Sequence, residues 1–338
     1  MARETSHNHI ITDENKRLFN EDSVRLLDEF MIYLQTIGRA EGTIEGYRND
    51  IEMFFVWNLE KNKNKFFIDV TKKDIMFFQN YCMNVLKVGS ARYRHMRSAL
   101  SSMSNYIENM CDDEYPTFKN IVNRVEAPPK KAVRKKSVFT DDELQVLLDY
   151  LVENKQYEKA CCLALAMSGG ARKSELLRFK TWYFDDENLV YGSLYQTPEK
   201  IITKGRGGKP LTKYTLKSKF KPYLDLWMNE RKRLGIESEW LFVNKDGTTQ
   251  RKATSLDKWA NQFTKMLNKD FYWHSMRHNC CTYLSKAGIP HSVIKDLFGW
   301  ESVDMCLTYD DSELSDKLGE YFSTEGIKKA EKKSLTDL

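Results

Sequence analysis

Apolar residues recur at helical spacing in the first third of the chain. Leu, Ile, Phe, Met or Tyr returns every three or four positions, with charged residues between, which is typical of amphipathic helices. Each run begins at a Ser or Thr, residue types that cap helix N-termini, and Asp74 follows Thr71 at the spacing of a capping box. The pattern predicts four helices, over residues 23–37, 43–58, 71–86 and 90–109.

The chain beyond residue 138 mixes helical and strand patterns. Short β-prone runs, "NLVYGSL", "KIITK" and "PLTKYTL", lie around the glycine-rich turn "GRGG". Helical periodicity occurs over residues 141–153, 158–167, 218–234, 255–267, 274–287 and 291–298. We therefore expect a mainly α protein, in which an N-terminal domain of four to five helices precedes an α+β domain of helices with a small antiparallel sheet.

A basic stretch, "APPKKAVRKKS", separates the two patterns. Its Pro-Pro pair resists both helix and central strand, so we expect an extended linker. A polyanion that follows a backbone is the natural ligand of such a stretch, and a solvated tether is the alternative. Its cations are Lys130, Lys131, Arg134, Lys135 and Lys136. The expected divisions are a flexible N-terminus (1–20), a helical domain (21–125), the linker (126–137), a larger domain (138–323) and a flexible tail (324–338).

Composition narrows the class of protein. With 338 residues, 41% hydrophobic and 30% charged, the chain is long enough for two globular domains. No apolar run reaches the roughly 18 residues that a membrane span needs, and "MARETSHNHI" lacks the apolar core of a secretory signal, so we expect a cytoplasmic protein. The seven cysteines include no C-x-x-C spacing, so no metal site is expected.

The net charge of +5 is uneven along the chain. Besides the linker, the fourth predicted helix carries Arg92, Arg94 and Arg97 among serines near its start. Cations beside hydroxyl groups on one helix can hold phosphates of nucleic acid, whereas a merely solvated face is the alternative.

The second domain holds a stronger pattern. In "SGGARKSELLRF", Arg172 stands three residues before Glu175, on the same helical face. A guanidinium held by a carboxylate is a rigid phosphate clamp. His274 and Arg277 repeat the same spacing about a hundred residues later. Two arginines, a histidine and a hairpin lysine around one anion would stabilise a pentavalent phosphate without any metal.

The order of these motifs resembles the tyrosine recombinase (phage integrase) family, in its Cre/Xer-like two-domain form. The motifs are "ARKSEL", "TKG" on a hairpin, "HSMRH", "GW" and a tyrosine nine residues past the Trp. The stretches "GTIEGYRNDIEMFF" and "VTKKDIMFF" resemble the family's helical core-binding domain. The region 138–322 resembles its catalytic domain, of the DNA breaking-rejoining type.

The resemblance implies a role for each matching residue. Tyr309 would be the nucleophile, and Arg172 and Arg277 would clamp the nonbridging oxygens of the scissile phosphate. Glu175 would orient Arg172, and His274 would bond the phosphate or take the proton of the tyrosine. The product implied is a 3′-phosphotyrosyl link with a free 5′ hydroxyl.

Two further residues complete the implied site. Lys204 would protonate the leaving 5′ oxygen, with Lys209 on the same hairpin as the alternative. Trp300 stands where many members carry a second histidine, as in Cre-like members, and its indole can donate one hydrogen bond but cannot shuttle a proton. No cofactor is implied, because this chemistry requires neither ATP nor a divalent metal.

The resemblance also implies partners. The substrate would be a double-stranded DNA recombination site, bound by a dimer per site and a homotetramer on two duplexes that form a Holliday junction. A helix over residues 312–323 would dock into a neighbouring protomer, or else fold back on its own domain. A bacterial, phage or mobile-element protein near the nucleoid is implied. The alternative functions are a type IB topoisomerase, a telomere resolvase or a DNA-binding protein with an inactive site.

Overall fold

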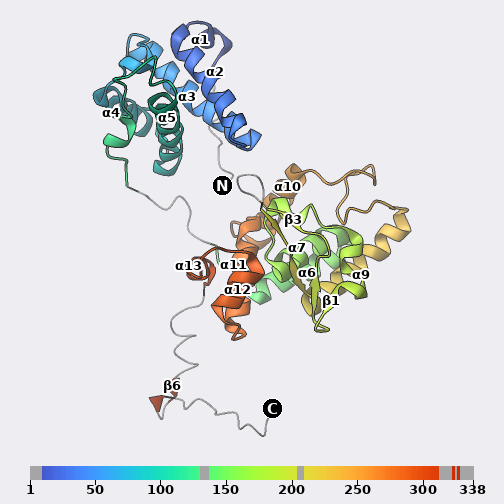
Figure 1. The fold of residues 1–338 in the computed structure, drawn as a ribbon. Coiled ribbons are helices and arrows are strands. Elements are labelled where there is room, and N and C mark those ends of the chain that lie inside the picture. Colours follow the sequence, from blue (N-terminus) through green and yellow to red (C-terminus); the bar gives the residue numbers. More distant parts are fainter. Residues whose placement is uncertain (1–9, 130–136, 204–208, 312–321, 324–325, 328–338) are drawn as a thin grey trace. The chain divides into compact units, whose positions relative to one another are not determined.

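The computed structural model describes residues 10–129, 137–203, 209–311, 322–323 and 326–327 (Figure 1). These residues divide into two compact units. The N-terminal unit comprises residues 10–129, and the C-terminal unit comprises the described residues from 137 on. The predicted basic linker cations at positions 130–136 lie outside the described residues.

The N-terminal unit is a helical bundle around an aromatic core. Phe30, Phe54 and Phe78 come from three different helices and are buried, and the rings of Phe54 and Phe78 meet edge to face at 5.1 Å. Its helices are α1 (Asp13–Arg17), α2 (Glu21–Thr36), α3 (Glu41–Lys61), α4 (Lys72–Asn80) and α5 (Ser90–Met110), with a π-helical turn at Tyr81–Val85 and 3-10 turns at Phe67–Asp69 and Val122–Arg124. The prediction of an all-helical N-terminal domain is confirmed.

The N-terminal caps agree with the predicted ones at α4 and differ at α2. The capping box at Thr71 is present as predicted, with the Thr71 side chain accepting from the Asp74 backbone. Helix α2, however, begins two residues before Ser23, because the Asn20 side chain caps it instead. The Ser23 hydroxyl is left to accept a hydrogen bond from the backbone of Phe67 at 2.9 Å, which ties α2 to a neighbouring turn.

Helix α1 was not expected, since residues 1–20 were predicted to be flexible. Thr12 caps α1, Ile10 and Ile11 pack against the core, and Phe19 is buried. Lys16 forms an ion pair with Glu52 at 2.8 Å. The prediction is therefore wrong for residues 10–20, because a five-residue helix is too short to show periodicity.

The C-terminal unit is built around α7 (Tyr157–Gly169), whose residues 160–168 are all buried. Helices α6 (Asp141–Glu153), α9 (Lys217–Leu234) and α11 (Trp273–Lys286) pack on α7 from several sides (Figure 1). The remaining helices are α8 (Lys173–Leu176), α10 (Ala253–Leu267), α12 (His291–Phe298) and α13 (Asp304–Tyr309), with 3-10 turns at Thr181–Phe184 and Asp186–Asn188. A central helix that is buried all round gives the elements of the site a rigid base.

Two small antiparallel sheets accompany these helices, as predicted. One has the order β1 (Leu189–Val190), β2 (Leu194–Gln196) and β5 (Tyr214–Leu216). The other pairs β3 (Ile201–Ile202) with β4 (Pro210–Leu211), with Ile201 opposite Leu211. The hairpin tip, which includes the predicted acid Lys204, lies outside the described residues.

The predicted tail helix is wrong at its end. Phe322–Ser323 form β6, which pairs with β7 (Gly326–Ile327), whereas residues 312–321 lie outside the described residues. Glycine is a poor helix former, so Gly326 just after this segment favours a hairpin over a continued helix. Among the described residues, no helix combines the length and apolar character that crossing a bilayer requires.

Candidate active site

Two glycines after α7 place the first arginine. Gly170 ends the helix with a φ of +56°, and a Cβ there would lie 2.5 Å from the ring of Phe298. A Cβ at Gly169 would lie 3.0 Å from the Thr215 hydroxyl of β5. Only glycine fits at position 170, where a positive φ is combined with this close approach. The chain can thus pass between α12 and β5 and start α8 with Arg172 as its N-cap.

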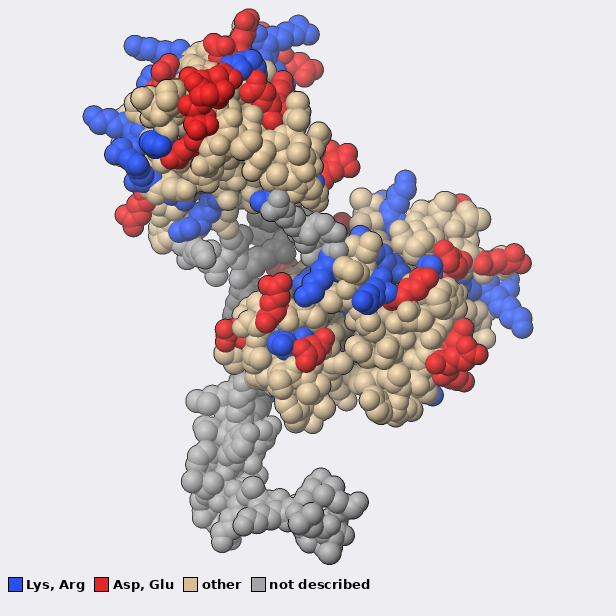
Figure 2. Space-filling model, viewed as in Figure 1, with Lys and Arg blue, Asp and Glu red and all other residues tan. Residues whose placement is uncertain are grey.

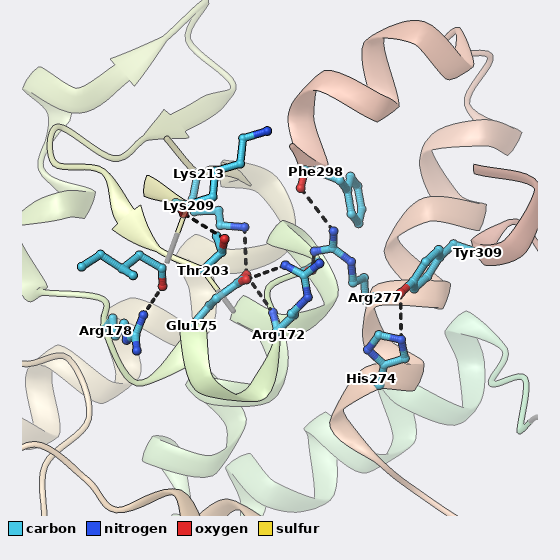
Figure 3. Close-up of polar contacts among 12 residues, drawn as sticks. Arg172, Glu175, Arg178, Thr203, Lys209, Lys213, His274, Arg277, Phe298 and Tyr309 are labelled. Carbon is cyan, nitrogen blue, oxygen red and sulfur yellow. Dashed lines mark hydrogen bonds and ion pairs between the residues drawn. The ribbon is translucent and has the colours of Figure 1, made fainter. Parts of the chain in front are cut away.

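Arg172 is held by a fully buried carboxylate. Its Nη1 donates to Glu175 Oε1 at 2.8 Å, and its backbone N–H donates to Oε2 at 3.0 Å (Figure 3). Lys213 Nζ lies 2.8 Å from the same Oε2. Burial opposes the ionisation of Glu175, but the ion pair with Lys213 and the hydrogen bonds from Arg172 outweigh it and lower its pKa to about 2. Glu175 is therefore a carboxylate at any physiological pH.

Arg277 is a buried cation that forms no ion pair with a carboxylate of the described residues. Its side chain donates to the carbonyls of Gly170 at 2.8 Å and Phe298 at 3.2 Å. The rings of Phe298 and Trp300 lie 4.6 and 5.0 Å from its Cζ. Burial, followed by the charge of Arg172, lowers the pKa of Arg277 to about 10, so it stays charged at neutral pH. Among the described residues its Nε finds no hydrogen-bond partner, which leaves one donor for a ligand.

Tyr309, on α13, lies among His274, Trp300 and Arg277. Its hydroxyl is 3.0 Å from His274 Nε2, and His274 projects from α11 toward it (Figure 3). Trp300 stacks on the tyrosine ring at 4.8 Å, and Arg277 Cζ is 5.7 Å from that ring. The tyrosine is buried and His274 is exposed. A phenol is thus paired with a base at a cationic site.

The segment after α12 brings Trp300 into the site. Gly299 has a φ of +66°, and a Cβ there would lie 2.2 Å from the Leu211 side chain of β4. The close approach brings the β3–β4 hairpin against the turn that carries Trp300. The indole is buried on Phe298 and Tyr309, and its Nε1 has no hydrogen-bond partner among the described residues. It is a second buried donor available to an acceptor such as a phosphate oxygen.

Two aspartates beyond the tyrosine fasten the end of α13 to α11 and α12. Asp310 accepts a hydrogen bond from the Ser285 hydroxyl at 2.8 Å, and His291 Nε2 lies 3.6 Å from the same carboxylate. The backbone N–H of Asp311 donates to the Thr282 hydroxyl at 2.8 Å. These contacts fix the end of the short helix that presents the nucleophile candidate.

Two residues of the site were missed by the sequence reasoning. Lys213 lies between β4 and β5, where no local spacing relates it to Glu175. His278 stacks on Tyr309 at 4.5 Å, and its Nδ1 is 3.7 Å from Asp311 Oδ2. Its position one helical turn after His274 was the available signal, since residues four apart share a helix face. Lys209, the alternative hairpin acid, is exposed, and its carbonyl accepts from Thr203.

The arginines predicted to bind DNA in the N-terminal unit have other partners. Arg97 donates to the carbonyls of Val122 and Val125 at 3.0 and 2.9 Å. Arg94 donates to the Pro128 carbonyl at 2.8 Å, and Arg92 pairs with the buried Asp50, which also contacts His95.

Surface charge is mixed on the face drawn in Figure 2, where Lys and Arg lie among Asp and Glu on both units. On that face, the Lys and Arg residues of the described part of the chain are not gathered into one basic area.

The chain matches known families over most of its length. Residues 137–315, more than half of the chain, match the phage integrase family, and residues 26–117 match the phage integrase N-terminal SAM-like domain. The SPbeta prophage-derived recombinase-like protein YomM of Bacillus subtilis (strain 168) is 28% identical over 283 residues, which cover 81% of this chain and 82% of that protein. The tyrosine recombinase of Thermosipho africanus (strain TCF52B) is 23% identical over 298 residues, covering 84% and 94%.

Solved structures share the fold at low sequence identity. XerH site-specific recombinase bound to palindromic difH substrate has a TM-score of 0.64 at 15% identity and covers 89% of this chain and 96% of its own. A lambda integrase tetramer bound to a Holliday junction has a TM-score of 0.62 at 16% identity and covers 89% and 81%. Together with the family match, these similarities confirm the fold and the resemblance inferred from the motifs. The chain belongs to the phage integrase family of tyrosine recombinases.

Proposed function

We propose that this protein is a site-specific recombinase that cuts and rejoins double-stranded DNA, with Tyr309 as its nucleophile. The observation that carries the proposal is the Tyr309 hydroxyl 3.0 Å from His274 Nε2, with the Arg277 guanidinium carbon 5.7 Å from the centre of the tyrosine ring. A phenol has a reference pKa of about 10 and needs a proton acceptor and nearby positive charge to attack at neutral pH. Both are supplied here by neighbouring side chains.

In the cleavage step, the Tyr309 oxygen forms a bond to the scissile phosphorus and the bond from phosphorus to the 5′ oxygen breaks. The phenolic proton passes to His274, and Lys204 donates a proton to the departing 5′ oxygen. The product is a 3′-phosphotyrosyl link with a free 5′ hydroxyl. Attack by a 5′ hydroxyl reverses the step, so no bond energy is lost and no ATP is required.

The charge that develops on the phosphate is met by fixed donors. Arg172 and Arg277 are the clamp on the nonbridging oxygens, and the Trp300 Nε1 adds one hydrogen bond. Nε of Arg277 and Nε1 of Trp300 support this role, because neither has a hydrogen-bond partner among the described residues and each can donate to a phosphate oxygen. Donors fixed before the reaction stabilise a transition state without reorganising.

The assembly we propose is a homotetramer on two duplexes, with one dimer at each site. The support is the lambda integrase structure, whose protein is a tetramer on a Holliday junction and shares this fold. The tail at 312–321, which would link protomers, lies outside the described residues. The linker cations Lys130, Lys131, Arg134, Lys135 and Lys136 would follow the DNA backbone.

The test is covalent trapping. Nicked duplexes tiled over the DNA that flanks the gene are incubated with wild-type protein and with Tyr309→Phe, and denaturation-resistant adducts are sought. We expect adducts from the wild type alone, because the variant lacks the attacking oxygen, while both proteins bind DNA equally. Adducts that persist in Tyr309→Phe would show that another residue is the nucleophile.

Metal independence has its own test. We expect EDTA to leave the rate of adduct formation unchanged, because Arg172, Arg277 and Lys204 supply the positive charge that a metal ion would otherwise bring. The measurement is a single-turnover cleavage rate with and without chelator. A rate restored only by Mg²⁺ would contradict the proposed mechanism.

A further inference from the structure

Lys213 is a buried lysine whose side chain and backbone both have fixed partners. Its side chain is only 3% exposed, and Nζ lies 2.8 Å from Glu175 Oε2. Its backbone N–H donates to the Thr197 hydroxyl at 2.9 Å, and its carbonyl accepts from the Thr197 backbone at 2.9 Å. The chain therefore fixes both the position of the residue and the direction of its ammonium group.

An ammonium in this position is costly for the fold. Burial lowers the pKa of Lys213, and the Glu175 carboxylate is the group that opposes this effect. Replacing a buried ion pair by apolar residues is often neutral or stabilising, so stability alone does not account for the lysine. A role in the chemistry of the adjacent arginine is the better explanation.

The two oxygens of Glu175 divide its contacts. Oε1 accepts from the Arg172 guanidinium, whereas Oε2 accepts from the Arg172 backbone and from Lys213. Without the lysine, the carboxylate charge would cancel the charge of Arg172. With the lysine present, the three groups sum to one net positive charge, and Arg172 keeps its attraction for an anion.

We propose that Lys213 is a positioning residue, which holds Oε2 of Glu175 so that Oε1 aims Arg172 at the scissile phosphate while its charge stays available. This inference rests on the proposed function, because it assigns Arg172 to the phosphate clamp. Lys213 itself acts through Glu175 and does not touch the phosphate. Because Lys213 follows β4, its contact with Glu175 also connects the β3–β4 hairpin to α8, whose N-cap is Arg172.

The test compares Lys213→Met with wild type on a duplex recovered by covalent trapping. Met keeps the length and apolar stem of lysine but removes the charge. We expect single-turnover cleavage to slow by about tenfold or more, because a misaimed clamp loses transition-state binding. DNA affinity should stay within about twofold, because the loss falls on the chemical step.

The pH profile separates positioning from a merely structural role. In Lys213→Met, the pKa of Glu175 should rise from its low value, so protonation of Glu175 in mildly acidic buffer would release Arg172. The cleavage rate of the variant should therefore fall as the pH is lowered. Over the same pH range Glu175 of the wild type stays ionised, so its protonation does not change the wild-type rate. The double variant Lys213→Met, Glu175→Gln, whose amide does not titrate, should stay slow and lose this acid dependence.

Lys269→Met is the matched control. Lys269 is a half-buried lysine that follows α10 and forms an ion pair with Glu143 of α6 at 2.9 Å. The Lys269→Met protein should cleave DNA at the wild-type rate. Wild-type rates or an unchanged pH profile in folded Lys213→Met would overturn the positioning role. Absence of adducts from wild-type protein on every duplex would instead overturn the proposed function, and this inference with it.

Discussion

Arginines gather in both units, but the two sets have different surroundings. In α5 of the N-terminal unit, Arg94 and Arg97 donate to backbone carbonyls, and Arg92 pairs with Asp50. In the C-terminal unit, Arg172 and Arg277 come from elements about a hundred residues apart and meet beside one tyrosine. Cations spaced along one helix diverge and find local partners, whereas cations brought together by the fold can share one anion.

The largest expected effect separates two buried arginines of the C-terminal unit. Arg277 and Arg231 are both buried and both donate to carbonyls, Arg231 to those of Ser238, Trp240 and Leu241. Arg277→Ala should slow cleavage by about 10²–10³, as the loss of a transition-state donor does. Arg231→Ala should lower the free energy of unfolding but leave the cleavage rate of the folded protein near that of the wild type.

Single-turnover cleavage and thermal unfolding of both variants measure this difference. Equal rates for the two variants would remove the distinction between a clamp and a structural arginine. A slow Arg231→Ala protein that remains folded would extend the functional site into the α9 region.

The sequence was sufficient for the motif residues of the C-terminal unit. Arg172 with Glu175, and His274 with Arg277, show their relation through a three-residue helical spacing. In the structure Arg172 bonds to Glu175, and both His274 and Arg277 lie beside Tyr309. Lys213 could not be found in the same way. The contact of Lys213 with Glu175 depends on strand pairing across the β2–β5 sheet, which no local pattern records.

Helix bounds show the same limit on a smaller scale. Thr71 was predicted as a cap because its box partner Asp74 lies in the same segment. Ser23 was predicted as a cap on residue type alone, yet its hydroxyl bonds to Phe67, 44 residues away. Local competition among Asn20, Ser23 and tertiary partners decides such positions, and residue type does not.

A smaller effect concerns how Glu175 makes the stability of the fold depend on pH. The pKa of Glu175 is about 2 in the folded protein and about 4.3 in an unfolded chain, so the carboxylate stabilises the fold above pH ~4.3 and loses this contribution as the pH falls toward 2. The shift corresponds to an upper limit of about 3 kcal/mol. Glu175→Gln should therefore be less stable than wild type at neutral pH, and the difference should narrow in acid.

Urea unfolding of both proteins between neutral pH and pH 3 measures this change. A difference that is constant with pH would mean that Glu175 acts through shape and hydrogen bonding rather than charge.

The smallest expected effect distinguishes the arginines of α5 from one another. Arg92 is 40% exposed beside its partner Asp50, so it can also reach a phosphate, whereas Nη2 of Arg97 already donates to the carbonyls of Val122 and Val125 and its Nε is buried. Arg92→Ala should weaken DNA binding and reduce the slope of log affinity against log salt by about one. Arg97→Ala should leave that slope unchanged and destabilise the N-terminal unit by about 1–3 kcal/mol, because it leaves two carbonyls without their donor. DNA titrations at several salt concentrations, together with urea unfolding, measure both quantities. A reduced slope in Arg97→Ala would show that its carbonyl contacts give way to phosphate when DNA binds, and the contrast between the two units would then be one of degree.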